Sequence, residues 1–296
     1  MIDSHLHLWD SGQLDYDWLH HVPAIAGRHG PEDFVRLDRR PSQAVFVQAD
    51  CAPSQALAEV DWVAGLAPSA LDIPAIVAFA PLETGAAVQS HLDALQRRPQ
   101  VRGVRRSTQN EADGFLSTPG HIDGMVAAAE RSLTLDVCVR DRQLPELVKA
   151  LETLFARVPA ARVVLDHLGK PDIALHGGDV TGADWADNLK RLAALPQVFA
   201  KISGLTTQDD WATGRDATLR PYIDHALACF SSDRLMFGGD WPVVDLAGGY
   251  GRWLTIFDQA TAHLSAEDRE RLSGGVAADV YRIPPRPTFR RRPDDP

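Results

Sequence analysis

The run MIDSHLHLWD, residues 1–10, begins the chain with a strand pattern that ends in polar side chains. Successive side chains of a strand point to opposite faces, so Asp3, His5 and His7 are expected to share one face. An open, doubly wound sheet normally carries a glycine-rich phosphate loop after its first strand. Here the strand leads instead into histidines and Trp9. This stretch therefore favours a closed barrel over an open sheet.

Seven further runs rich in apolar and β-branched residues follow at regular intervals. They are AVFVQAD (44–50), AIVAFAPL (75–82), VRGVRRS (101–107), LDVCVRD (135–141), VVLDHLG (163–169), VFAKISG (198–204) and LMFGGDW (235–241). Stretches with helical periodicity separate most of them, for example 144–158 and 185–195. Eight such units in 296 residues predict an α/β fold, a single (β/α)8 TIM barrel over residues 1–283.

Two segments fall outside this pattern. The stretch 10–41 is broken by glycine and proline and follows the first strand, on the face where barrels place their active sites. Its aromatic and histidine side chains are expected either beside the substrate or packed on the barrel rim. These side chains are Tyr16, Trp18, His20 and His21. The tail 284–296 is rich in proline and arginine and is expected to be a surface strap or a disordered end.

Composition excludes several classes of protein. The 30 Lys and Arg against 40 Asp and Glu give a net charge of −10, which disfavours nucleic acid and anionic membranes as partners. Three scattered cysteines, Cys51, Cys138 and Cys229, are too few and of the wrong parity for a disulfide framework. The first residues lack a signal-peptide pattern, and no run is long and apolar enough for a membrane span. A soluble, cytoplasmic protein is expected, and its oligomeric state stays open.

Three motifs place titratable side chains at expected strand ends. His5 and His7 lie about 7 Å apart along a strand and can converge on one metal ion or one carbonyl oxygen. Alternation lets only one of Asp166 and His167 face inward, and His167 is the better candidate because an imidazole can act as acid, base, donor or ligand. Asp240 follows two glycines and can serve as a metal ligand, as a general base for water, or as both.

In this order and on these strands, the motifs resemble the amidohydrolase superfamily. DHLGKP (166–171) and FGGDWPV (237–243) resemble its sugar-lactonase branch, which includes fuconolactonase-like and rhamnonolactonase-like enzymes and dicarboxylate-lactone hydrolases. The resemblance implies a (β/α)8 barrel and hydrolysis of a sugar-acid lactone. It also implies either a single Zn²⁺ or other divalent ion or no metal at all. The fourth strand lacks the bridging ligand of binuclear members, and the fifth lacks the usual histidine. The ligands implied for a single ion are His5, His7, His167 and Asp240.

Further side chains are candidates for contact with the substrate. Two adjacent arginines follow a strand, so one should face the pocket and bind a carboxylate or hydroxyls, unless both form salt bridges at the rim. A strand lysine can do the same or pair with an acid, a glutamine offers a neutral donor and acceptor, and tryptophans offer flat walls to a sugar ring. These candidates are Arg105, Arg106, Lys201, Gln48, Trp9, Trp241 and Trp18, with Cys138 as a further neighbour of the site.

These observations predict a hydrolase that opens the ring ester of an aldonolactone, with L-fucono-lactone as the first substrate by resemblance. Asp240 would deprotonate water, while His5, His7 and His167, or one metal ion that they hold, would stabilise charge on the carbonyl oxygen. The net charge favours a neutral ring over a multiply charged substrate, unless Arg105 or Arg106 reverses the field locally. The alternatives are a lactone isomerase, a dicarboxylate-lactone hydrolase, a metal-dependent decarboxylase and a sugar-acid binder without activity.

Overall fold

The protein is a barrel of parallel strands. The computed structural model describes residues 1–66, 71–181, 184–211 and 214–285. Eight strands form one sheet in chain order, each parallel to the next. They are β1 (Ile2–Leu6), β4 (Gln43–Val47), β5 (Asp72–Phe79), β6 (Val101–Ser107), β7 (Thr134–Cys138), β8 (Val163–Leu165), β9 (Val198–Ile202) and β10 (Leu235–Phe237). A parallel bridge between Leu6 and Trp241 joins the last strand region to the first. The predicted barrel is confirmed, since each of the eight runs overlaps one of the eight strands.

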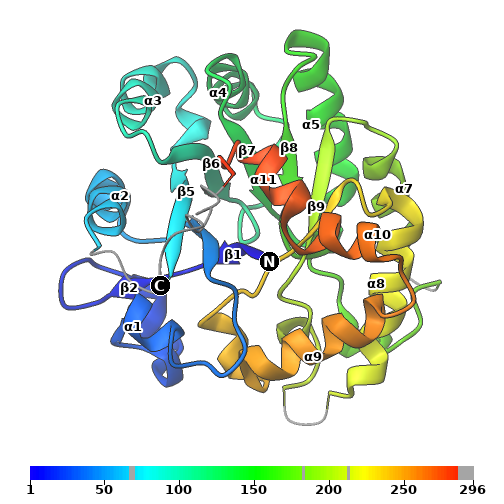
Figure 1. The fold of residues 1–296 in the computed structure, drawn as a ribbon. Helices are drawn as coiled ribbons and strands as arrows, with labels where there is room; N and C mark the ends of the chain where they lie inside the picture. The colour runs from blue at the N-terminus through cyan, green and yellow to red at the C-terminus, as the bar shows by residue number, and fades with distance from the viewer. Residues whose placement is uncertain (67–70, 182–183, 212–213, 286–296) are drawn as a thin grey trace, which may run out of the picture.

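Helices surround the strands (Figure 1). They are α1 (Pro31–Phe34), α2 (Ala56–Ala64), α3 (Gln89–Gln96), α4 (Pro119–Glu130), α5 (Leu144–Arg157), α6 (Ile173–His176), α7 (Asp184–Ala193), α8 (Asp216–Phe230), α9 (Gly249–Thr261), α10 (Ala266–Glu270) and α11 (Val276–Val280). The helices predicted from periodicity are α5 and α7. In α5, Leu144, Leu147, Leu151 and Leu154 recur on one face and are all buried. That apolar stripe explains why the helix packs against the sheet.

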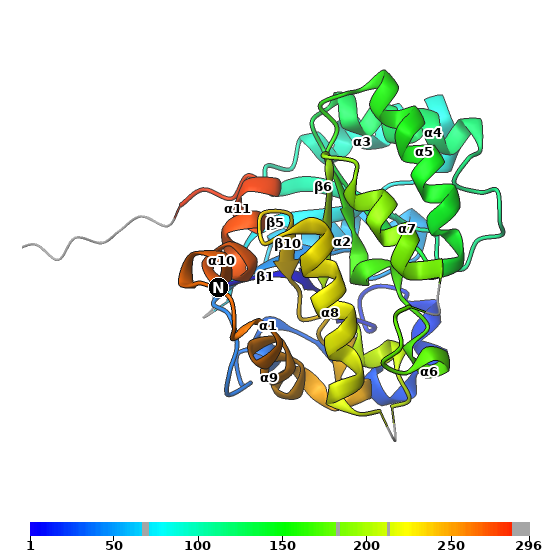
Figure 2. The same cartoon turned by 90° about the vertical axis from the view of Figure 1, so that its right-hand side faces the viewer.

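A separate cluster closes the amino-terminal end of the barrel. Ile2, Val45 and Val77 point inward from their strands and pack against Val280 and Tyr281 at the end of α11. In Figure 2, α10 and α11 lie together at the side of the molecule where the amino terminus is marked. The opposite, carboxyl ends of the strands remain available for a site, as is usual for this architecture.

The long connection after β1 is an ordered unit rather than a loose loop. It contains a two-stranded ribbon, β2 (Trp9–Asp10) with β3 (Arg28–His29), and short 3₁₀ turns at Asp17–His21 and Pro23–Ile25. Its apolar side chains form their own cluster against the segment after β4. The buried members are Trp9, Leu14, Tyr16, Leu19, Ile25, Ala49 and Cys51. The connection is therefore fixed above the strand ends.

Two of the remaining predictions concern the tail and the membrane. Residues 286–296 lie outside the described residues, so the prediction for the tail 284–296 stays a prediction. None of the helices in the described part of the chain combines the length and the apolar character that a membrane crossing requires.

The contact between α4 and the turn Leu82–Val88 yields a stability prediction. A Cβ added to Gly124 would lie 2.0 Å from the backbone oxygen of Leu82. Gly124→Ala is expected to lower the free energy of unfolding by about 1–3 kcal/mol, because the helix must move away from the turn. Gly251→Ala in α9 is the control, since no atom beyond its chain neighbours and the backbone of its own helix lies within 4 Å of the added carbon. That change should leave stability unchanged or raise it by up to about 1 kcal/mol. Urea unfolding measures both, and equal midpoints would contradict the packing argument.

Candidate active site

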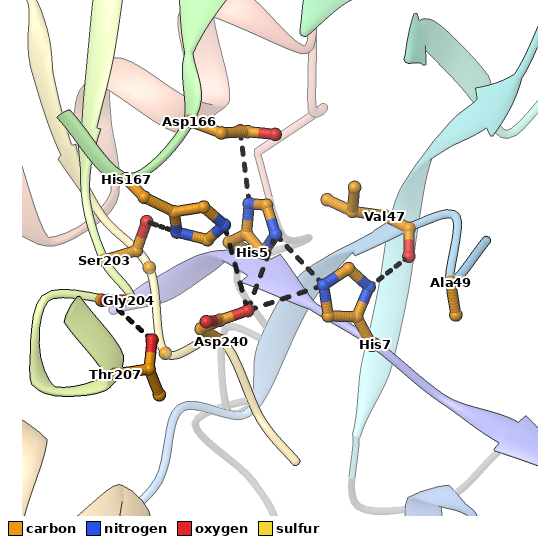
Figure 3. A network of polar contacts seen from close by, with 12 residues as sticks. His5, His7, Val47, Ala49, Asp166, His167, Ser203, Gly204, Thr207 and Asp240 are labelled. Atoms are coloured by element: carbon orange, nitrogen blue, oxygen red, sulfur yellow. Dashed lines mark hydrogen bonds and ion pairs between the residues drawn. The ribbon is translucent and has the colours of Figure 1, made fainter. Parts of the chain in front are cut away.

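Three histidines and one aspartate meet at the carboxyl ends of the strands (Figure 3). The Nε2 atoms of His5 and His7 are 3.1 Å apart. Oδ1 of Asp240 lies 3.8 Å from Nε2 of His5, 3.5 Å from Nε2 of His7 and 4.0 Å from Nε2 of His167. The structure thus brings together the four residues that were predicted to be catalytic or metal-binding.

The other ring nitrogen of each histidine has a fixed partner. Nδ1 of His7 is 2.8 Å from the carbonyl oxygen of Val47, and Nδ1 of His167 is 2.9 Å from Oγ of Ser203. Nδ1 of His5 lies 3.2 Å from Oδ1 of Asp166. These contacts orient the rings so that their Nε2 atoms converge on Asp240.

Asp3 does not join this group, and its predicted position is wrong. The register between β1 and β4 shifts between Asp3 and Leu6, which interrupts the simple alternation of side chains. The Asp3 carboxylate instead accepts hydrogen bonds from the backbone N–H groups of His5 and Gly239 and from the hydroxyl of Tyr250. Asp3 therefore ties β1 to the segment before Asp240 and acts as a structural residue.

Asp166 and His167 both reach the centre of the site, so the prediction that only one of them faces inward is also wrong. The backbone turns left-handed immediately after β8, with φ of 54° at His167, 51° at Leu168, 74° at Gly169 and 51° at Lys170. Four successive left-handed residues are rare in L-amino-acid chains. This turn removes the strand alternation on which the sequence argument relied.

A buried network of charges lies directly beneath the histidines. Asp166 lies 3.0 Å from Nζ of Lys201 and accepts a hydrogen bond of 3.2 Å from Arg105. Lys201 also donates to Asp136 at 2.5 Å, and the hydroxyl of Tyr281 donates to the same carboxylate at 2.8 Å. Lys201 therefore pairs with acids, which was one of its two predicted roles. The sequence analysis did not identify Asp136. An acid inside the apolar run LDVCVRD was the available signal, because a buried acid needs a buried cation as its partner.

Burial and charge set the protonation states. Burial lowers the pKa of His5 well below its usual value and that of His167 to about 4, so both rings are neutral near pH 7. Burial alone would raise the pKa of Asp166, but Lys201 and His5 outweigh it and hold that pKa well below normal. Burial is likewise outweighed at Asp240, whose pKa is lowered by the neighbouring His167, His7 and His5. Neutral imidazoles thus face an ionised carboxylate.

A cavity of about 320 Å³ opens above this cluster. Of the predicted residues, it is lined by His7, His167, Asp240, Arg105 and Trp18, and also by His21 and Cys138. Lining residues that the sequence analysis missed are Asp50, Ser107, Gln109, Asn110, Lys170 and Thr207. Most of these follow directly after strands, and that position was the available signal. The volume suits a small molecule.

Other predicted residues are held away from the described cavity lining. Arg106 pairs with Glu83 and Glu111, so the rim salt bridge is what the structure shows for this arginine. Trp9 is buried against Tyr16 and Trp18, and Trp241 against Phe34 and His29, which leaves neither tryptophan as a wall of the cavity. Tyr16 is buried in the apolar cluster of the connection after β1, which includes Trp9 and Leu19. His20 lies outside the described lining of the cavity. His5, Gln48 and Lys201 lie beneath the cavity and are fully buried.

Two overlapping groups of side chains could hold a metal ion, His5 with His7 and Asp240, and His5 with Asp166 and His167. In a tetrahedral zinc site with bonds of about 2.0–2.1 Å, neighbouring ligand atoms lie about 3.3 Å apart. The separations among His5, His7 and Asp240, of 3.1, 3.5 and 3.8 Å, lie near that value, whereas His167 lies 4.0 Å from Asp240. The carbonyl oxygen of Val47 can only accept, so Nδ1 of His7 donates to it, and Nε2 is the nitrogen that would bind an ion. His5, His7 and Asp240 also lie close enough together to share one ion.

Comparison with known proteins agrees with this geometry. The family model described as amidohydrolase matches residues 2–283. The chain belongs to the amidohydrolase family. It is 35% identical over 292 residues to an L-fucono-1,5-lactonase of Burkholderia multivorans, with 96% of each chain covered. It is 32% identical to an L-fucono-1,5-lactonase of Burkholderia ambifaria, over 95% of each chain.

A solved structure shares the whole fold. The crystal structure of an amidohydrolase from Burkholderia multivorans with bound zinc superposes with a TM-score of 0.83 at 31% identity. The match covers 96% of this chain and 99% of that one. The amidohydrolase barrel that the sequence motifs implied is thereby confirmed.

The buried Glu59 on α2 yields a prediction about how the stability of the fold depends on pH. Burial raises the pKa of Glu59 to about 8 from an ordinary 4.5, against a hydrogen bond from the N–H of Ala49. Between pH 4.5 and 8 the folded state then holds one more proton than the unfolded state. The protonated Glu59 therefore makes its whole contribution to the free energy of unfolding below pH 4.5. That contribution is lost as pH rises to 8, at up to about 1.4 kcal/mol per pH unit.

Urea unfolding of the wild type and of Glu59→Gln between pH 5 and 9 tests this. The wild type is expected to lose stability relative to the variant as pH rises, and the difference should level off above about pH 8. The exposed Glu152→Gln on α5 serves as the matched control and should follow the wild type. Parallel curves for all three proteins would show that Glu59 is ionised in the fold.

Proposed function

We propose that the protein is a lactonase that opens the ring ester of a sugar-acid lactone, with L-fucono-lactone as the first substrate. The observation that carries the proposal is the ionised carboxylate of Asp240, which faces the Nε2 atoms of three histidines at the floor of a small cavity. The two relatives named L-fucono-1,5-lactonase support this choice of substrate.

Asp240 is the general base of the reaction. Its carboxylate accepts a proton from water as the water oxygen attacks the lactone carbonyl carbon. When the tetrahedral intermediate collapses, the bond between the carbonyl carbon and the ring oxygen breaks. The proton on Asp240 passes to that oxygen, which becomes the hydroxyl of the open acid. The carboxylate thus begins and ends the cycle ionised.

The histidines are suited to hold a metal ion beside Asp240. A divalent ion on His5, His7, His167 and Asp240 would act as a Lewis acid toward the carbonyl and would make bound water more acidic. Burial keeps the pKa of His167 near 4, so protons do not compete for this ring near neutral pH. Asp166, Val47 and Ser203 keep the rings in place from behind.

The charges of the cavity favour a neutral lactone over a dicarboxylate lactone. Among its described lining residues, the carboxylates of Asp50 and Asp240 balance the cations of Arg105 and Lys170. Arg105 is already paired with Asp166, and Lys170 donates to Gln109. Binding two further carboxylates would require cations without such partners.

Asp240→Asn tests the role of the base. The substitution keeps the shape of the side chain but removes its basicity, so kcat on L-fucono-1,5-lactone should fall by about 10²–10⁴-fold. The exposed Asp187→Asn on α7 changes the net charge equally and should keep wild-type kcat. Thermal unfolding monitors the fold of each variant. Near-normal turnover by Asp240→Asn would remove Asp240 from the mechanism.

A proton-release screen over aldonolactones tests the reaction and the metal together. We expect one proton for each lactone opened, and loss of activity after treatment with a chelator, restored by Zn²⁺. Metal analysis should find about one zinc per chain in the wild type and much less in His5→Ala. A shifted lactone carbonyl signal without proton release would indicate an isomerase instead. No turnover of any aldonolactone would refute the proposal.

A further inference from the structure

Asp50 occupies an unusual backbone position at the cavity. It follows β4 and has a φ of 55°, in the left-handed region that residues other than glycine rarely adopt. Such a conformation persists only where surrounding contacts enforce it, and it is common at sites that bind ligands. Asp50 also lines the cavity that holds His167 and Asp240.

A reciprocal pair of hydrogen bonds holds Asp50 in this position. Nε2 of Gln48 donates to Oδ1 of Asp50 at 3.0 Å, and the backbone N–H of Asp50 donates to Oε1 of Gln48 at 2.6 Å. Gln48 is fully buried, so this pair of bonds has little freedom to move. Both polar ends of Gln48 are thereby used on Asp50.

The same pair of bonds connects Asp50 to the catalytic cluster. Arg105 donates to the backbone oxygen of Gln48 at 2.6 Å and to Asp166 at 3.2 Å. Asp166 in turn lies 3.2 Å from Nδ1 of His5. The carboxylate of Asp50, although exposed, is therefore linked through Gln48 and Arg105 to the groups of the site.

One oxygen of Asp50 remains available to a ligand. Within the described residues, Oδ2 accepts no hydrogen bond, whereas Oδ1 receives that of Gln48. Asp50 does not cap the following 3₁₀ turn either, because Ala52 is its N-cap and no side chain bonds there. An ionised carboxylate oxygen in a polar cavity is a strong acceptor for hydroxyl groups.

We propose that Asp50 is a specificity-determining residue that accepts hydrogen bonds from the ring hydroxyls of the substrate, and that Gln48 positions it. The inference rests on the proposed function, because the ligand is taken to be a hydroxylated lactone ring. It gives the enzyme a means to prefer sugar lactones over lactones without hydroxyls. Loss of one charge-assisted hydrogen bond corresponds to about 10- to 100-fold in binding.

Asp50→Asn tests the proposal with little change in shape. Asparagine tolerates the left-handed backbone and keeps an oxygen for Gln48, but presents an amide group to the ligand in place of Oδ2. The value of kcat/KM for L-fucono-1,5-lactone should fall about 10- to 100-fold, mainly through KM. The value for δ-valerolactone, which has no hydroxyls, should change by less than about threefold. Asp187→Asn should match the wild type on both substrates.

Gln48→Leu tests the positioning role. It should lower the ratio of kcat/KM values for the two lactones, which is independent of the amount of folded enzyme. Adding it to Asp50→Asn should lower that ratio little further, because both changes remove the same interaction. An equal loss on both lactones in either variant would overturn the proposal, as it would show a general effect on catalysis or folding.

A binding measurement separates this inference from the proposed function. 1,5-Anhydro-L-fucitol carries the ring and hydroxyls of the lactone without its carbonyl, so it binds without reacting. Calorimetry should show a dissociation constant about 10- to 100-fold higher for Asp50→Asn than for the wild type. Equal constants, or no binding to the wild type, would overturn the role of Asp50. Absence of proton release by the wild type would instead overturn the lactonase proposal.

Discussion

The buried carboxylate of Asp166 is the interaction on which the rest of the site depends. It meets Lys201, Arg105 and His5, and all four side chains are almost completely shielded from water. Isolated charges at such depth would be very costly, but two acids, Asp136 and Asp166, balance two bases here. Removing one member of a buried pair typically costs about 3–5 kcal/mol because a charge is left unpaired. The histidines of the candidate site rest on this balanced layer.

That layer explains how one barrel holds both a polar site and an apolar core. Its members come from β6, β7, β9 and the turn after β8, so no single segment determines the positions of the reactive groups. The layer separates the converging histidines from the apolar plug formed by Val45, Val77 and Val280. Burial keeps the pKa values of His5 and His167 low, so neutral imidazoles and an ionised Asp240 coexist near pH 7.

Much of the fold could be predicted from the sequence because it depends on local pattern. Each apolar run became a strand, and the regular spacing of leucines in 144–158 became α5. Errors arose where the backbone departs from a regular strand. The shift in β1 turned Asp3 toward Tyr250, and the left-handed turn after β8 brought Asp166 and His167 to the same place. The pattern could not tell which of Arg105 and Arg106 faces the cavity, because Glu83 and Glu111 meet Arg106 only in three dimensions.

The contact between Tyr281 and Asp136 has a consequence for synthesis on the ribosome. A hydroxyl near the end of the described chain completes the polar surroundings of a carboxylate that was made 145 residues earlier. Ile2 likewise packs against Val280 and Tyr281, so the first strand finds its final neighbours among the last helices. While Val280 and Tyr281 are still inside the ribosome, the nascent chain cannot bury its ion network completely. Folding of this barrel must therefore finish after α11 has been translated. The amino-terminal half cannot complete its folding before the carboxyl-terminal half is made.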